Sequence, residues 1–137
     1  MHLLMEEAEK SGIAIACHFQ AVNEGMIRVE ADSASLTAQG QIFSLMKRHK
    51  GNRLCSTSQE AVVTLDREGK TVATVVNASY RNWKSVDFAQ YGPCSQAVLY
   101  SSDTVLPPSV FTETDVLDQA QGGTFDMPPH SVLFLVF

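Results

Sequence analysis

The sequence contains too few cysteines, too far apart, for a disulfide framework or a thiolate metal site. Its three cysteines are Cys17, Cys55 and Cys94, and no Cys-x-x-Cys pair occurs. Reduced thiols are the simplest interpretation, and they favour a cytoplasmic location, which the sequence otherwise leaves unknown. Cys17, His18 and Glu24 are the nearest group of ligand types, but neighbours in a strand point to opposite faces. We therefore expect no metal and no cofactor.

The sequence also lacks the features of membrane and nucleic-acid-binding proteins. No run approaches the roughly 18 apolar residues of a membrane-spanning helix, and the N-terminus lacks the charged-then-apolar order of a secretory signal. The net charge is −5. The densest basic run, Lys47-Arg48-His49-Lys50, falls at a predicted helix end, where cations complement the helix dipole. We therefore expect neither a membrane nor a nucleic-acid partner.

The first part of the chain, residues 1–52, has a helix–strand–helix pattern. Apolar spacing predicts helices over residues 3–10 and 37–50, the second with Thr37 as its cap and Gly51 after its end. Gly40 weakens this second helix by about 1 kcal/mol relative to alanine. Residues 13–19 form a run that is apolar on both faces, as in a parallel sheet covered by helices. No sibling strand follows, so we expect this segment to be the end of a larger α/β protein.

The second part, residues 53–137, has the periodicity of β-strands. Short strands are predicted over residues 53–56, 61–66, 71–77, 84–88, 96–100, 109–112, 124–127 and 131–137. Seven or eight short strands separated by Pro and Gly turns are typical of an antiparallel β-sandwich. The last strand is apolar on both faces, and burying each such side chain is worth roughly 1.5–3 kcal/mol. The N-terminal helices, or a barrel that the chain lacks, must therefore cover its second face.

Three strings of residues occur in an order that resembles one enzyme family. Residues 15–23 read Ile-Ala-Cys-His-Phe-Gln-Ala-Val-Asn, residues 36–54 contain Gly-Gln-Ile-Phe and Arg-His-Lys-Gly, and residues 128–132 read Pro-Pro-His-Ser-Val. Together they are similar to the C-terminal end of arabinofuranosidase-type retaining glycoside hydrolases, in which an antiparallel β-sandwich follows a (β/α)8 barrel. The resemblance implies a mainly β chain, with a barrel remnant in residues 1–52 and a β-sandwich accessory domain in residues 53–137.

The resemblance implies one substrate-contacting residue and no catalytic residue. Gln20 matches a family glutamine that hydrogen-bonds a sugar hydroxyl at the end of the last barrel strand, where barrel active sites form. The plainer interpretation is that Gln20 satisfies loop backbone. Retaining glycosidases need two carboxyl groups about 5–5.5 Å apart, and the family's two glutamates would lie upstream of residue 1. The acids of this chain are expected to be solvated charges, so we expect the chain alone not to hydrolyse glycosides.

The first functional hypothesis is therefore a non-catalytic C-terminal portion of a glycoside hydrolase resembling α-L-arabinofuranosidase. It would stabilise the catalytic barrel, and the whole enzyme would act on an arabinoside or a related plant polysaccharide. A second hypothesis is a free-standing carbohydrate-binding module in which Tyr80, Trp83 and Tyr91 stack on sugar rings, unless one or two of them cap the core. A third is a homo-oligomeric structural domain that pairs through the barrel remnant. His130, after two prolines, is expected at the surface without a partner.

Overall fold

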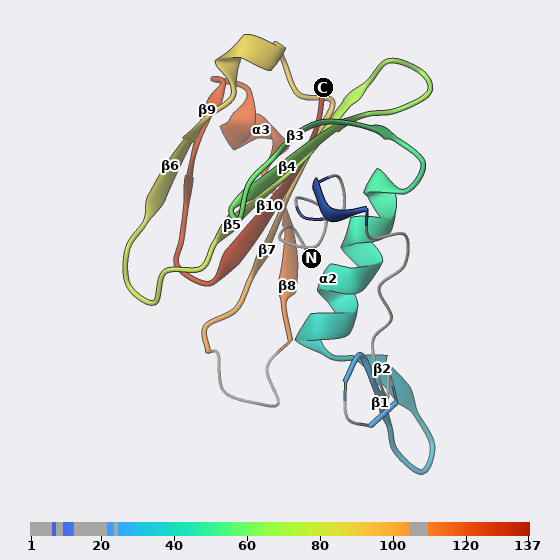
Figure 1. Ribbon diagram of the computed structural model, residues 1–137. Helices are drawn as coiled ribbons and strands as arrows, with labels where there is room; N and C mark the ends of the chain where they lie inside the picture. The colour runs from blue at the N-terminus through green and yellow to red at the C-terminus, as the bar shows by residue number, and fades with distance from the viewer. Residues whose placement is uncertain (1–6, 8–9, 13–21, 24, 105–109) are drawn as a thin grey trace.

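The computed structural model describes residue 7 and residues 10–12, 22–23, 25–104 and 110–137. Two antiparallel layers make up most of it (Figure 1). The large layer is a six-stranded sheet in the order β3-β4-β5-β10-β7-β8, and the small layer pairs β6 with β9. The strands are β3 (Arg53–Thr57), β4 (Ala61–Leu65), β5 (Thr71–Asn77), β6 (Lys84–Asp87), β7 (Gln96–Ser101), β8 (Thr112–Asp115), β9 (Thr124–Met127) and β10 (Ser131–Val136). The expected mainly β antiparallel sandwich is confirmed.

Strand β10 is the centre of the large sheet because it is paired along its whole length on both sides. Every residue of β10 has a partner in β5 and another in β7. Successive side chains of a strand point to opposite faces, so Leu133 and Leu135 share one face. They lie in an apolar cluster with Phe125 and Met127 of β9, which fills the space between the two sheets. This inner face holds the sandwich together.

The opposite face of β10 is covered by the helix α2 (Ala38–Met46), which lies beside the large sheet in Figure 1. Val132 and Phe134 pack with Leu45 of α2, and Ile42 packs against the same cluster. This helix is the cover that the two-sided apolar pattern of residues 131–137 predicted. The helix predicted over residues 37–50 is confirmed, although its last turn is the 3₁₀ helix η1 (Lys47–His49).

One member of the basic run is buried rather than exposed at the helix end. His49, in η1, is only 4% exposed. Its Nδ1 lies 2.8 Å from Oγ1 of Thr64 and its Nε2 lies 2.6 Å from Oγ1 of Thr74, on the neighbouring strands β4 and β5. Both threonines are themselves buried. His49 lies in the last helical turn, as the basic run predicts, and its ring also forms a polar link between the end of the helix and the sheet.

A short hairpin of β1 (Ile27–Val29) and β2 (Ala34–Leu36) precedes α2 and is tied to its first turn. The Thr37 hydroxyl accepts a hydrogen bond from the Gly40 amide at 3.2 Å and donates to the Gly25 carbonyl at 2.7 Å. The Thr37 amide donates to the Met26 carbonyl at 3.0 Å. A Cβ atom at residue 40 would overlap that same Met26 carbonyl. Gly40 therefore weakens the helix by propensity but permits the close approach of the hairpin.

Several elements differ from the sequence-based expectation, among them the unpredicted β1–β2 hairpin. The strand predicted over residues 109–112 is wrong in position, because the structure has β8 at Thr112–Asp115. All four residues of β8 are exposed at the sheet edge, so pairing with β7 rather than an apolar pattern defines it. The short helix α3 (Leu117–Ala120) was not predicted, although Val116 and Ala120 are buried in the core. The strand expected over residues 13–19 and most of the helix expected over residues 3–10 lie outside the described residues.

Candidate functional site

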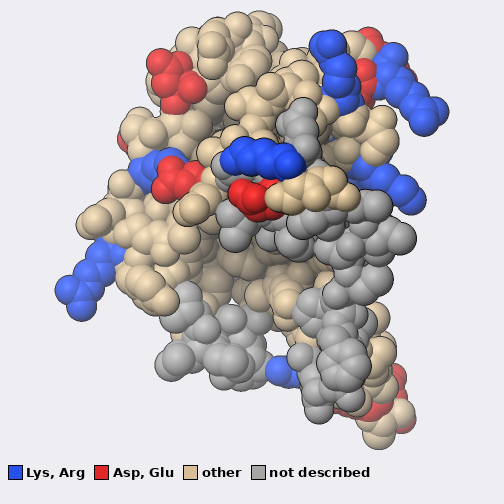
Figure 2. Space-filling view, in the orientation of Figure 1, with Lys and Arg blue, Asp and Glu red and all other residues tan. Residues whose placement is uncertain are grey.

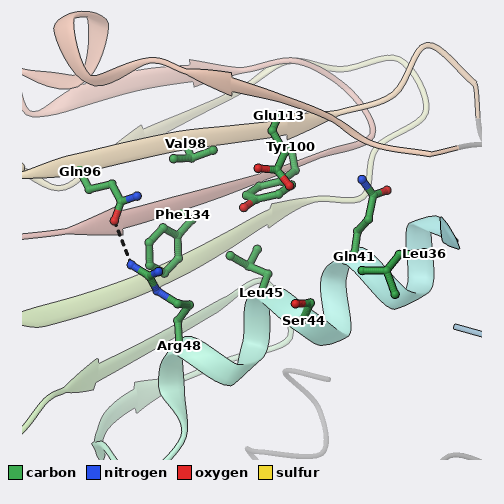
Figure 3. Close-up of a pocket in the computed structure, with 10 residues that line it drawn as sticks. All are labelled: Leu36, Gln41, Ser44, Leu45, Arg48, Gln96, Val98, Tyr100, Glu113 and Phe134. Carbon is green, nitrogen blue, oxygen red and sulfur yellow. Dashed lines mark hydrogen bonds between the residues drawn. The ribbon is translucent and has the colours of Figure 1, made fainter. Parts of the chain in front are cut away.

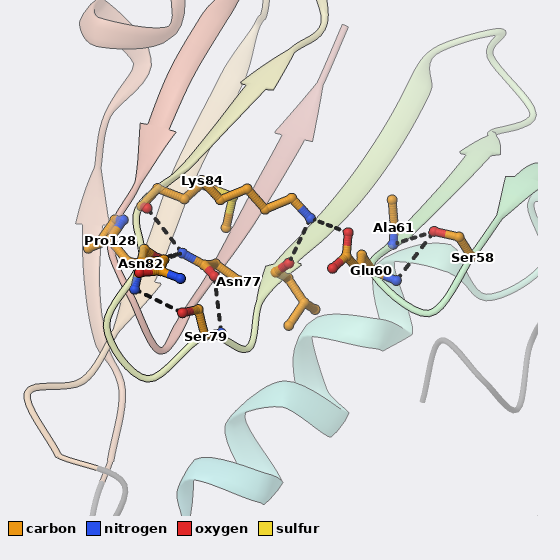
Figure 4. Close-up of polar contacts among 10 residues, drawn as sticks. Ser58, Glu60, Ala61, Asn77, Ser79, Asn82, Lys84 and Pro128 are labelled. Carbon is orange, nitrogen blue, oxygen red and sulfur yellow. Dashed lines mark hydrogen bonds and ion pairs between the residues drawn. The ribbon is translucent and has the colours of Figure 1, made fainter.

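The loop between β5 and β6, residues 78–83, is built around the buried side chain of Asn77. Its Nδ2 atom donates to the carbonyls of Asn82 and Pro128, each at 2.9 Å, and to that of Met127 at 3.2 Å (Figure 4). Its Oδ1 atom accepts a hydrogen bond from the Ser79 amide at 3.1 Å. One asparagine therefore closes the loop on itself and fastens it to the turn between β9 and β10.

Ser79 fixes the rest of the loop. Its hydroxyl oxygen accepts hydrogen bonds from the amides of Asn82 at 2.8 Å and Arg81 at 3.3 Å, and its carbonyl accepts one from the His130 amide at 3.3 Å. Short polar side chains such as Asn and Ser favour turns because they bond to the backbone a few residues on. The loop consequently has a defined shape although it lies at the surface.

Two of the three aromatic residues singled out in the sequence project from this loop. Tyr80 is 74% exposed and Trp83 is 67% exposed. The Tyr80 ring meets the imidazole of His130 edge-on, with centroids 5.1 Å apart and planes at 80°. The expectation that His130 has no partner is therefore wrong. His130 has a positive φ of 53°, an unusual backbone conformation for a residue with a side chain, which fits its place in a tight turn.

Tyr91 does not belong to the same surface. It ends the 3₁₀ helix η2 (Ala89–Tyr91), which follows β6, whereas Trp83 immediately precedes β6. The two residues therefore lie at opposite ends of that strand (Figure 1). The Tyr91 ring packs on Phe137 at 5.2 Å, and Phe137 packs on the buried Phe88 at 5.7 Å. Tyr91 takes the core-capping role that the sequence left open for one or two of these aromatics.

An ion pair joins the two sheets beside the aromatic loop. Nζ of Lys84, in β6, lies 2.6 Å from a carboxylate oxygen of Glu60, which precedes β4 (Figure 4). The same ammonium group donates to the Val76 carbonyl at 3.3 Å. The hydrogen bond from Lys84, and then its charge, hold the pKa of Glu60 below the ordinary value of 4.5. Glu60 is thus a structural partner of lysine and has no feature of a catalytic acid.

A second polar site, which the sequence did not suggest, is a groove between α2 and the strands β7 and β8 (Figure 3). Its cavity volume is about 210 Å³. The Arg48 guanidinium lies over the Phe134 ring, 5.1 Å from its centroid, and donates to Oε1 of Gln96 at 3.0 Å. Burial, and to a lesser extent the nearby Glu113 carboxylate, raise the pKa of Tyr100 above its ordinary value of 10.0. The groove therefore combines an aromatic floor with polar walls of both charges.

Gln41 closes one end of this groove. Its side-chain amide forms the two hydrogen bonds to Phe111 that a neighbouring strand would form with a backbone residue. Its Nε2 atom donates to the Phe111 carbonyl at 2.9 Å, and its Oε1 atom accepts from the Phe111 amide at 2.7 Å. The side-chain amide thereby takes the place of a neighbouring strand and ties the approach to β8 onto the helix. A polar residue beside the apolar stripe of α2 was the only sequence signal for this contact.

The other predicted site residues can be placed only in part. Gln20, Cys17, His18 and Glu24 lie outside the described residues, so Gln20 stays a prediction. Cys55 is an exposed thiol, whereas burial raises the pKa of the Cys94 thiol above its ordinary value. Within the described ranges, no group of three or more His, Cys, Asp or Glu side chains is arranged to hold a metal ion.

Several described carboxylates have structural partners at turns. Asp66 Oδ1 accepts hydrogen bonds from the amides of Glu68 and Lys70, both at 2.8 Å, in the β4–β5 turn. Asp87 and Asp115 accept amide hydrogen bonds at the starts of η2 and α3. These carboxylates therefore end strands and shape turns.

Charge is dispersed over the face of the molecule drawn in Figure 2. On the face drawn in Figure 2, the lysines and arginines that the structure describes stand among acidic and uncharged residues and form no continuous basic area. Of the helices in the described part of the chain, none has the length and apolar character needed to cross a membrane.

The comparisons with known proteins give structural neighbours only. No protein-family model and no curated protein sequence matches the chain. The fold is similar to the catalytic domain of GH30 xylanase C from Talaromyces cellulolyticus, with a TM-score of 0.55 and 17% identity over 82% of this chain and 27% of that one. It is similar to an arabinofuranosidase structure with a TM-score of 0.52 and 18% identity over 82% of this chain and 31% of that one. The chain thus shares the fold of less than a third of each of these glycoside hydrolase structures, which confirms the predicted resemblance at the level of the fold.

Proposed function

We propose that this chain is a non-catalytic β-sandwich portion of a glycoside hydrolase and that it stabilises the catalytic barrel. The observation that carries the proposal is the fold match, which takes in 82% of this chain and only 27% and 31% of the two neighbours. The structural roles of Glu60, Asp66, Asp87 and Asp115 support a non-catalytic function. The neighbours are a xylanase and an arabinofuranosidase, so we propose an arabinoside or a related plant polysaccharide as the substrate of the whole enzyme.

The surface that we assign to the barrel contact is the outer side of the hairpin and of α2. Val29 of the hairpin and Phe43 of α2 are exposed apolar side chains. Phe43 lies on the same helix as Leu45 but outside the cluster that α2 forms with the sheet. Apolar side chains left exposed together mark a protein contact more often than isolated ones do. Gln20 would contribute a hydrogen bond to the sugar from the last barrel strand.

The test compares this 137-residue chain with the product of the reading frame extended upstream. We expect the extended product to hydrolyse 4-nitrophenyl arabinofuranoside or arabinoxylan and the short chain to show no hydrolysis. Phe43→Ser should lower the melting temperature of the extended product and leave that of the short chain unchanged, because only the barrel would cover this side chain. Gln20→Ala should raise KM in the extended product.

Two results would contradict the proposal. One is glycoside hydrolysis by the short chain itself, and the other is an upstream frame that encodes no barrel with two glutamates. The hypothesis of a homo-oligomeric structural domain makes the opposite prediction for the short chain. In that case light scattering would give a multiple of the monomer mass, and Phe43→Ser would return the monomer.

A further inference from the structure

We propose that the loop of residues 78–83 is a binding platform for neutral oligosaccharides, with Tyr80 and Trp83 as the stacking residues. The choice of sugar rests on the proposed function, but the site itself is argued from the geometry of the loop. The proposal narrows the three aromatic residues suggested by the sequence to two, because Tyr91 packs on Phe137 at the other end of β6.

The first argument is that the loop is held in shape before any ligand binds. Asn77 and Ser79 together satisfy backbone groups of the loop and of the β9–β10 turn. Binding to a mobile loop loses affinity to the entropy of ordering it, and a fixed loop avoids that loss. Tyr80 and Trp83 are mostly exposed on this fixed backbone, so they bury little area in the core.

The second argument is the chemistry that surrounds the rings. A sugar ring presents apolar C–H faces and a rim of hydroxyl groups, so it is bound by aromatic faces with hydrogen-bonding groups beside them. Arg81 and Asn82 are exposed between Tyr80 and Trp83 in the sequence of the loop, and both side chains carry donors. The imidazole of His130 packs nearly perpendicular to the Tyr80 ring. The loop therefore offers both kinds of contact in one place.

The third argument is that the loop suits a sugar ligand better than a protein or nucleic-acid partner. A stable protein interface takes about 800 Å² from each side. Other large apolar side chains are exposed on the β1–β2 hairpin and on α2, namely Val29, Leu36 and Phe43. These elements do not lie beside the loop of residues 78–83 (Figure 1). Single-stranded nucleic acid also stacks on aromatics but needs a positive groove, and the chain has a net charge of −5. Two isolated rings suit a short neutral ligand best.

The chain offers a direct probe because Trp83 is its single tryptophan. We expect xylo- or arabino-oligosaccharides to change the emission of Trp83 in a saturable manner and to protect it from iodide quenching. Tyr80→Ala should weaken binding by roughly tenfold or more, since one of the two rings is lost. Tyr91→Ala is the matched control, an aromatic at the other end of β6, and should leave the titration unchanged.

Retardation of the chain in native gels that contain arabinan or xylan tests Trp83 itself. Trp83→Ala should lose the retardation, and Trp83→Phe should keep most of it. Circular dichroism would check that each variant is folded. A Trp83 signal that stays unchanged up to about 10 mM of both oligosaccharides, or a titration that Tyr80→Ala leaves intact, would overturn the proposal. Such a result would not contradict the proposed function, which is tested by hydrolysis with the extended product. Conversely, an extended product without hydrolysis would not contradict a positive oligosaccharide titration.

Discussion

The two faces of β10 are covered in different ways, although both are apolar in sequence. On the inner face, Leu133 and Leu135 meet other apolar side chains of the sandwich and need no particular partner. On the outer face, Phe134 packs under Leu45 and Arg48, and the neighbouring part of the sheet binds His49 through two threonines. Apolar burial supplies most of the stability on the inner face, whereas the outer face also uses directional contacts that position one helix. The inner face should therefore tolerate repacking better than the outer face.

The largest expected effects come from truncating adjacent residues that point to opposite faces of β10. Leu133→Ala should lower the free energy of unfolding by about 2–5 kcal/mol and Phe134→Ala by about 3–5 kcal/mol, because both side chains are almost completely buried. Urea unfolding measures both losses. The two variants should differ in where they loosen the fold.

Amide hydrogen exchange at α2 sharpens this contrast. Phe134→Ala removes the ring under Arg48 and Leu45, so exchange in α2 should rise more than exchange in β6 and β9. Leu133→Ala should raise exchange in β9 at least as much as in α2. Equal patterns in the two variants would mean that helix and sandwich unfold as one unit and that the two faces do not differ.

A smaller loss is expected from His49→Ala, which removes the directional contacts of the outer face. The Thr74 hydroxyl loses the imidazole in a buried place, whereas the Thr64 hydroxyl still accepts a hydrogen bond from Nδ2 of Asn52 at 3.1 Å. One unsatisfied buried polar group costs about 1–3 kcal/mol, and the packing of the buried ring is lost as well, so we expect a loss of about 2–4 kcal/mol in chemical denaturation. Lys50→Ala, one residue away and exposed, is the control and should change stability by less than about 0.5 kcal/mol. Similar losses in the two variants would argue against the polar link.

The smallest expected effect is that of Gly40→Ala. Helix propensity and packing predict opposite signs for its change in stability. Helix propensity alone predicts that Gly40→Ala stabilises the chain by about 1 kcal/mol. The new Cβ would overlap the Met26 carbonyl, so we expect a loss of about 1–3 kcal/mol instead. Gly122→Ala, at a position with open space around it, should be neutral or slightly stabilising. Thermal unfolding of the two variants gives the comparison, and a gain in stability for Gly40→Ala would mean that the hairpin does not dock as described.

The sequence predicts those helices and strands whose own residues show a clear pattern of apolar and polar positions. The alternation and turn of residues 61–77 and the apolar run of residues 131–137 correspond to β4, β5 and β10. The need for a cover over the second face of β10 also followed from side-chain burial alone, and α2 provides it. These features depend on periodicity and on the free energy of burying apolar area, both of which can be evaluated from the sequence.

Contacts between segments far apart in the chain could not be predicted. His49 looks like part of a basic run until the threonines of β4 and β5 are brought next to it. Strand β8 has no apolar residue to mark it, so its position depends on pairing with β7. Tyr91 is separated from Tyr80 and Trp83 because β6 runs between them. The positions of the aromatic residues in the sequence do not show this separation. The predicted contact of Gln20 with a sugar still rests only on the resemblance of residues 15–23 to the glycoside hydrolase family.

The buried amide of Asn77 has a consequence for the choice of expression host. Asn77-Ala78-Ser79 matches the acceptor tripeptide for N-linked glycosylation. The nitrogen that would carry the glycan is the donor to three backbone carbonyls in the folded chain. A glycan attached during translocation would displace these bonds and prevent the β5–β6 loop from closing against the β9–β10 turn. In a secretory host, glycosylation and folding would therefore compete for the same atom, and only the unmodified molecules would complete the sandwich.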